Sequence, residues 1–150
     1  MSRILDTRKK FNFLVEINGI PQFEVQKFKV PSVSIEQSNH AEANSDIKTA
    51  GRVMIENATF EKLRPVVGFD NEMWNWLTSA QNHVLGTGSL PTNYKRNIVV
   101  RELAPNGITL STYVLTGAWC CKIEQDEYDR ATSDKMLTKG EISVDSVIVI

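Results

Sequence analysis

The sequence predicts a mainly β protein: an antiparallel β-sandwich or barrel with one flanking α-helix. Three observations predict this fold class. Apolar and polar residues alternate with a period of two along several segments of the 150-residue chain. Turn signals, among them Pro105-Asn106-Gly107, separate these segments. Residues 70–86 are the single stretch in which apolar residues recur with the spacing of an amphipathic helix.

Length and composition limit the class of protein. The 150 residues, 41% hydrophobic and 23% charged, fit one globular domain spanning 1–150. A net charge of -1 excludes a dedicated nucleic-acid clamp, which would carry a basic excess. The two cysteines are adjacent, so we expect free thiols and a reducing compartment. The longest apolar run, residues 147–150, is far too short to span a bilayer, and we expect no membrane association.

The first strands follow from alternation. In residues 11–19 the side chains of Phe11, Phe13, Val15 and Ile17 share one face, which is typical of a half-buried strand. Asn18-Gly19 then favours a hairpin turn into a second strand within residues 23–30. Pro31 suits the edge of a sheet because it has no N–H to donate.

A long hairpin is predicted next. Residues 32–40 and 52–60 alternate on either side of a polar excursion, residues 41–50, which we expect to form an oversized tip. One face of this hairpin is apolar, and both faces would be satisfied if that face covered the domain core and the other faced water. A long edge strand also invites pairing with another chain. Either the edge is blunted, or pairing is its purpose. The apolar face consists of Val33, Ile35, Val53 and Ile55, and the polar face includes Ser34, Glu36, Ser38, Arg52 and Glu56.

The second half of the chain is predicted to contain one helix followed by further strands. Asp70 is the predicted N-cap, and Gly86 stands where a left-handed residue would end the helix. Met73, Trp76, Leu77, Ala80 and Val84 would form its buried face. Residues 95–103 and 108–119 flank the turn at Pro105-Asn106-Gly107, and residues 136–150 form a last strand or pair of strands.

The residues that carry chemistry are sparse. His40 and His83 are the two histidines, and no zinc-binding or nucleophile motif accompanies them. Carboxylates in residues 126–135 are mixed with cations, which is typical of a solvated loop. We therefore predict no enzyme: no catalytic, cofactor-binding or metal residue, and no cofactor. A lipocalin-like barrel that binds an apolar ligand and a small hydrolase are the alternatives from other classes.

The order of several segments resembles the tail tube proteins of contractile-tailed bacteriophages and related contractile injection systems. The opening strand, residues 11–19, is similar to the F-x-F-x-V-x-I-x-G strand of that family. The strand at residues 51–60, after the long polar loop, also matches. Residues 70–76 are similar to the D-x-E-L-W-x-W helix start, Gly117-Ala118-Trp119 to a late strand end, and residues 142–149 to the closing strand.

The resemblance implies a structural virion protein. Its subunits would form hexameric rings that stack into the inner tail tube, a conduit for DNA ejection, with hairpin strands joining into one inter-subunit β-barrel. The implied partners are sheath, baseplate, tail terminator and tape measure proteins, with genomic DNA held non-specifically in the lumen. The protein would assemble in the host cytoplasm and reside in the virion tail. A tube terminator, a baseplate adaptor and the tube of a genome-free injection system are the alternatives.

Within that picture, a DNA conduit should not hold its cargo. DNA carries about one negative charge per 1.7 Å of axis, so a lumen should be polar and neutral or acidic rather than basic. We therefore hypothesise that the polar face of the hairpin lines the lumen. The loop would reach a neighbouring subunit or ring. The luminal residues are Ser34, Glu36, Ser38, Arg52 and Glu56, and the loop residues are Ala41, Glu42, Asn44, Asp46 and Lys48.

Overall fold

A computed structural model describes residues 8, 10, 12–20, 25–41, 46–64 and 71–150. These residues form strands joined by short connections, with two helices, α1 (Glu72–Ala80) and the one-turn α2 (Pro91–Tyr94). The strands are β1 (Phe13–Ile17), β2 (Val25–Lys29), β3 (Val33–Ala41), β4 (Asp46–Ile55), β5 (Ala58–Leu63), β6 (Gln81–Asn82), β7 (Thr87–Gly88), β8 (Arg96–Leu103), β9 (Thr109–Gln125), β10 (Leu137–Ser143) and β11 (Ser146–Val149). The predicted fold class, mainly β with a flanking helix, is confirmed.

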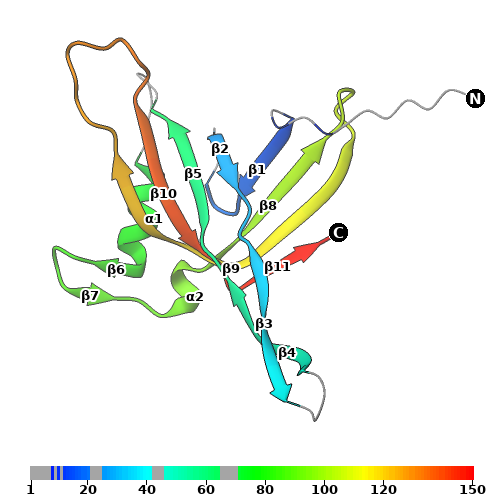
Figure 1. Cartoon of the computed structure of the whole chain (residues 1–150). Helices are drawn as coiled ribbons and strands as arrows, with labels where there is room; N and C mark the ends of the chain where they lie inside the picture. The colour runs from blue at the N-terminus through cyan, green and yellow to red at the C-terminus, as the bar shows by residue number, and fades with distance from the viewer. Residues whose placement is uncertain (1–7, 9, 11, 21–24, 42–45, 65–70) are drawn as a thin grey trace, which may run out of the picture.

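One antiparallel sheet runs through most of the strands, in the order β1-β8-β9-β10-β5-β2, with β11 also paired to β9. The 17-residue β9 belongs to both halves of this sheet. Its first part pairs with β8 and β11, and its second part, from Trp119 onward, pairs with β10. Figure 1 shows the result: two wings, β1-β8 on one side and β10-β5 on the other, which meet where β9 bends.

Gly117 allows this bend. It lies between the two parts of β9 with a φ of 61°, a left-handed conformation that favours glycine. A Cβ at this position would lie 2.0 Å from Oδ2 of Asp145. No other residue type fits here without moving the Asp145 side chain, and the bend therefore depends on glycine.

The core lies between the two wings and beneath α1. Alternation along β1 buries Val15 and Ile17, which are each 4% exposed, as the sequence predicts. The largest fully buried side chains are Trp76, Phe60, Met73, Ile98, Leu115, Ile142 and Cys120. Gly140 brings β10 close to its neighbours, because a Cβ there would lie 2.8 Å from the Phe60 ring and 2.3 Å from the Lys122 carbonyl oxygen.

The helix is shorter than the sequence predicts. It begins at Glu72 and ends at Ala80, so its buried face consists of Met73 and Trp76. Val84 is 77% exposed in the turn between β6 and β7, and Gly86, with a φ of 68°, lies in that turn rather than at the helix end. The two-residue strands β6 and β7 pair with each other and replace the last predicted turns of the helix. The predicted N-cap, Asp70, lies outside the described residues.

The first two strands do not form a hairpin together. The chain turns at Asn18-Gly19, where Gly19 has a φ of 81°. However, β1 pairs with β8, whereas β2 pairs with β5 in the opposite wing. The hairpin that Asn18-Gly19 favours is therefore wrong, although the hairpin of β8 and β9 around Pro105-Asn106-Gly107 is confirmed. Among the described residues, neither helix has the length and apolar character needed to cross a membrane.

Candidate assembly interface

The β3–β4 hairpin stands apart from the rest of the fold. It forms a two-stranded sheet of its own and projects from the end of the molecule where the wings converge (Figure 1). Every residue of β3 is exposed. Within the described part of the chain, each of its two strands pairs only with the other, so both outer edges carry unpaired backbone groups. The expectation that one face of the hairpin covers the core of its own chain is wrong.

The predicted oversized loop is also wrong. Strand pairing continues from Val33↔Ile55 at the base to Ala41↔Asp46, so residues 46–50 belong to β4. Of the predicted loop residues, Ala41 and Lys48 lie in strands and Asp46 begins β4, while Glu42 and Asn44 lie outside the described residues. The polar composition of residues 41–50 predicts a loop. The backbone continues as strand because exposed strands tolerate polar residues on both faces.

A β-bulge divides the hairpin. Ile35 pairs with Val53, but Gln37 pairs with Ala50, so Gly51 and Arg52 together lie opposite Glu36. Gly51 suits this position because a Cβ there would lie 2.9 Å from the Glu36 carbonyl oxygen. The bulge inverts the alternation of β4 beyond it. An isolated glycine inside a strand pattern was the signal in the sequence.

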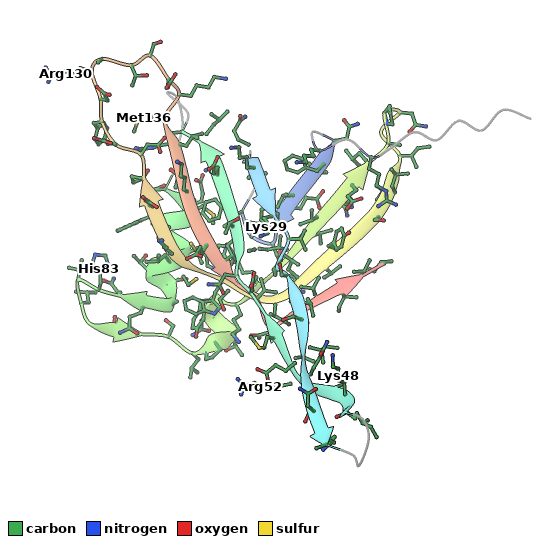
Figure 2. All side chains as sticks on the ribbon, viewed as in Figure 1. Lys29, Lys48, Arg52, His83, Arg130 and Met136 are labelled. Atoms are coloured by element: carbon green, nitrogen blue, oxygen red, sulfur yellow. The ribbon has the colours of Figure 1, made fainter. Side chains whose placement is uncertain are left out.

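The register decides which predicted residues share a face. Ser34, Glu36 and Ser38 share one face of β3. Met54 pairs with Ser34, so Arg52 in β4 and Glu56, the residue after β4, follow on the same face. The structure thus brings the five predicted polar residues to one face. Figure 2 shows Arg52 and Lys48 directed to opposite sides of the hairpin, as the bulge requires.

The polar face also carries an apolar residue that simple alternation does not place there. Ile47 pairs with His40 and is 46% exposed. Simple alternation places Ile47 with Val53 and Ile55, but the extra residue in the bulge moves it to the other face. Met54, opposite Ser34, is the second apolar residue there.

The opposite face is apolar near the base of the hairpin, and it exposes apolar side chains to water. Val33 pairs with Ile55, and Ile35 pairs with Val53. Val33, Ile35 and Val53 are nevertheless 52%, 55% and 55% exposed. A two-stranded hairpin is at most marginally stable alone in water, and clustered exposed apolar side chains typically mark an interaction surface. The hairpin therefore has the properties of an interaction surface.

The histidine and cysteine side chains are the remaining candidates for chemistry. Among the described residues no group of histidine, cysteine and carboxylate side chains could hold a metal ion. Cys120 is buried and free, and burial raises the pKa of its thiol to about 12, so it is not a reactive thiolate at neutral pH. His40 is exposed on the hairpin, and the His83 ring packs edge-on against Trp74 with centroids 5.7 Å apart.

Solved chains from contractile injection systems share this fold. A chain in the tube-terminating cap of the anti-feeding prophage superposes with a TM-score of 0.81 at 14% identity, covering 100% of this chain and 95% of that one. A chain in the sheath–tube complex of an extracellular contractile injection system superposes with a TM-score of 0.77 at 18% identity, covering 96% and 91%. An Hcp protein shares the fold more distantly, with a TM-score of 0.52 at 14% identity, covering 91% of this chain and 90% of that one.

The chain belongs to the T4-like virus tail tube protein gp19 family, whose model matches residues 9–146. No curated protein matches the chain. The family is one of structural tail tube proteins and not of enzymes, which excludes the small hydrolase. It gives no support to the lipocalin-like barrel. The resemblance noted from the sequence is confirmed at the level of the family.

Proposed function

We propose that residues 1–150 act as one tail-tube domain whose copies form hexameric rings, and that these rings stack into the inner tube of a contractile tail. The observation that carries this proposal is the hairpin with two free edges and two exposed faces. A closed barrel built from several copies removes free edges, which a single copy leaves unpaired. Membership of the tail tube family supports the same assembly.

The second part of the proposal concerns the lumen. The face with Ser34, Glu36, Ser38, Arg52 and Glu56 lines the channel, and DNA passes it during ejection. Two carboxylates and one guanidinium leave this face without the cationic excess that would grip phosphates. The hairpin tip, with Ala41, Glu42, Asn44, Asp46 and Lys48, contacts a neighbouring subunit or ring.

The partners follow from the position of a tube in a contractile machine. A sheath protein surrounds the tube, a baseplate and a terminator bound its two ends, and the tape measure protein and DNA occupy the lumen. The protein assembles in the host cytoplasm and ends in the virion tail. Solved chains of similar fold come from a baseplate, from a sheath–tube complex and from a sheath/tube terminator, which supports this placement.

A tube terminator is the second candidate. Chains with TM-scores of 0.81 and 0.80 come from a tube-terminating cap and a sheath/tube terminator. A terminator forms one ring that ends a tube, whereas a tube protein stacks without limit. The two candidates therefore differ in the length of what the purified protein builds.

Negative-stain electron microscopy of the purified protein over a range of concentrations tests the assembly. Open-centred rings that lengthen into tubes are the expected result. Rings that never stack identify the terminator, and monomers at every concentration contradict both candidates.

The luminal assignment has its own test. Replacing Glu36 and Glu56 together by lysine should slow DNA passage, because two cations replace two carboxylates along the path of the phosphates. DNA release from assembled particles is the measurement. The matched control, Glu124→Lys with Glu127→Lys, makes the same charge change at exposed positions outside the hairpin. Release at the rate of the unmodified particle would contradict the assignment.

A further inference from the structure

A long segment of the chain carries no acidic or basic charge. Residues 73–94 contain no lysine, arginine, aspartate or glutamate, although 23% of the chain is charged and a stretch of this length would on average hold about five such residues. The segment covers most of α1 and all of β6, β7 and α2. It keeps two tryptophans and a tyrosine. Depletion of charge with retention of aromatic residues is the compositional signature of the centre of a protein–protein interface.

This segment also exposes apolar side chains on a projecting ribbon. Val84 and Leu85 lie in the turn between β6 and β7 and are 77% and 72% exposed. In Figure 1 the ribbon projects sideways from the body of the molecule next to α1, and Figure 2 shows His83 near its outer end. The His83 ring packs edge-on against Trp74, which is itself 43% exposed on α1. We call Trp74, Val84 and Leu85 the β6–β7 knob.

The turn that carries the knob is rigidly built. The side-chain carbonyl oxygen of Asn82 accepts hydrogen bonds from the backbone N–H groups of Val84 and Leu85, at 3.0 and 3.2 Å. The N–H of Gly86 donates to the Asn82 backbone carbonyl oxygen at 2.8 Å, and the φ of 68° at Gly86 suits glycine. The two aliphatic side chains are therefore held in place before any contact forms, which lowers the entropic cost of binding.

The fold itself does not use the knob. The helix buries Met73 and Trp76, and in the described part of the chain β6 and β7 pair only with each other. A Cβ on Gly86 would meet no atom within 4 Å, so open space adjoins the turn. Single exposed apolar residues are common on protein surfaces. Adjacent ones on a rigid turn in a charge-free segment form an apolar patch, which marks an interaction site.

The clefts of a second copy do not match the knob. An aliphatic turn needs an uncharged apolar socket, because burying polar or charged groups without partners costs free energy. One cleft of about 390 Å³ has four lysines and three glutamates in its walls. Another, of about 1170 Å³, has four cations and one carboxylate. A third, of about 560 Å³, is lined by Glu16 and the side-chain amides of Asn18 and Asn97. The socket therefore belongs to a different protein.

The knob lies away from the surfaces that the proposed tube uses for self-assembly. In Figure 1 the β3–β4 hairpin projects from the end where the wings converge, whereas the β6–β7 ribbon projects to one side and β11 with the C-terminus lies on the other. An uncharged turn also makes no counterion-releasing contact with DNA phosphates. Among the partners in the proposed function, these features favour the protein that covers the flank of the tube, which is the sheath.

Repetition compensates for the small size of each contact. Two proteins that form a stable complex typically contribute about 20–30 residues each to their interface, far more than the knob offers. Every copy in a tube would present the same knob, so a sheath lattice with a matching repeat would engage many knobs at once. The rigid turn keeps the knobs at fixed positions, which such multiple engagement requires.

We propose that the β6–β7 knob is a contact through which the tube binds the sheath around it, and that a sheath subunit receives Val84 and Leu85 in an apolar socket without charge. This proposal rests on the proposed function, which surrounds the tube with a sheath, and names the surface that the sheath contacts. Because no ion pair takes part, the contact should depend only weakly on salt.

Photo-crosslinking in intact sheathed tails tests the contact. Leu85→p-benzoylphenylalanine places the crosslinker on the exposed turn with little risk to the fold. The tails are irradiated and digested, and mass spectrometry should find crosslinks from position 85 to the sheath protein. Their yield should fall less than twofold in about 1 M salt, where screening weakens ion pairs. The matched control, Ile108→p-benzoylphenylalanine, uses another apolar turn residue, 62% exposed, and should give at least tenfold fewer crosslinks to the sheath.

A pair of substitutions tests whether the knob is needed. Val84→Ser with Leu85→Ser should lower the fraction of tubes that carry a sheath at least tenfold, counted by negative-stain electron microscopy. Tube formation and the urea midpoint of the monomer should stay unchanged, because both residues are exposed. Ile108→Ser is the control and should leave the sheathed fraction unchanged.

Three results would overturn the sheath contact and leave the proposed tube standing: crosslinks from position 85 to other tube copies alone, crosslinks to the sheath that disappear in about 1 M salt, or normal sheathing of the double variant. Protein that forms no rings or tubes at any concentration would overturn the proposed function as well.

Discussion

The sandwich and the β3–β4 hairpin are built from the same kind of alternating sequence, but their apolar residues are buried in the sandwich and exposed in the hairpin. In β1 and β5, alternate residues such as Val15 and Phe60 are 4% and 1% exposed. In the hairpin, alternate residues such as Ile35 and Val53 are both 55% exposed. Alternation therefore specifies a ribbon with an apolar face, but it does not specify which surface covers that face. In the sandwich the cover comes from the same chain.

Apolar residues of the sandwich and of the hairpin contribute their burial free energy at different stages. Burying a large aliphatic side chain stabilises by about 1.5–3 kcal/mol. In the sandwich, this burial stabilises the folded single chain. In the hairpin, the apolar side chains stay exposed in the single chain and would stabilise only a contact that covers them. Substitutions in the hairpin should therefore affect assembly and leave the free energy of unfolding nearly unchanged.

The largest effect on folding should come from Trp76→Ala. Trp76 is 1% exposed, its indole N–H donates to the Tyr94 carbonyl oxygen at 2.6 Å, and the Arg96 guanidinium lies 5.3 Å from its ring centroid. Removing such a residue should lower the free energy of unfolding by about 3–5 kcal/mol, measured by urea denaturation. Trp74→Ala, at a 43% exposed neighbour on the same helix, should cost less than about 1.5 kcal/mol. Equal losses in the free energy of unfolding for the two variants would contradict the assignment of Trp76 to the core.

Hairpin variants should show the reverse pattern. Ile35→Asp with Val53→Asp removes two side chains worth about 1.5 kcal/mol each on burial, so assembly should need about a 100-fold higher protein concentration. The free energy of unfolding of the monomer should change by less than about 0.5 kcal/mol. Light scattering and urea denaturation measure the two quantities.

Ser34→Asp with Ser38→Asp is the control for charge, since it adds the same two carboxylates to the polar face. It should shift the assembly concentration less than tenfold. A hairpin variant that unfolds the monomer, or one that assembles normally, would remove the distinction between the two regions.

The bend in β9 should be sensitive to a single methyl group. Gly117→Ala must hold a φ of 61° and displace the Asp145 carboxylate, which pairs with Lys95 at 2.7 Å, so it should cost about 2 kcal/mol. Gly107→Ala also has a positive φ, 86°, but its Cβ would meet nothing within 4 Å, so it should cost about 1 kcal/mol. Thermal unfolding compares them. Equal costs would mean that Asp145 moves aside freely.

The smallest effect should appear at alkaline pH. Burial raises the pKa of Cys120 from 9.0 to about 12 in the folded protein, so the unfolded chain loses this proton first. The contribution is fully present below pH 9 and is lost as pH rises toward 12. By pH 10 the free energy of unfolding should fall by about 1.4 kcal/mol from this group.

Cys120→Ala should remove that part of the pH dependence, whereas Cys121→Ala, at a less buried thiol, should remove less. Urea denaturation at pH 8, 9 and 10 makes the comparison. A slope unchanged in Cys120→Ala would show that the buried thiol is not its source.

Much of the sandwich follows from local pattern, and the errors have identifiable causes. Alternation located β1 and the hairpin of β8 and β9, and helical spacing located Met73 and Trp76. The helix end was wrong because a short β6–β7 pairing replaced its last turns. The loop at residues 41–50 was wrong because polar residues on two exposed faces resemble a loop in sequence.

The sequence by itself determined a mainly β chain with a two-faced hairpin, because side-chain alternation is a property of each strand alone. The tertiary structure decided what alternation cannot express. It placed β1 and β2 in opposite wings, inserted the bulge at Gly51 that moves Ile47 to the polar face, and left the hairpin without a cover. Pairing partners and register depend on contacts between residues distant in the chain, and a local pattern contains no record of them.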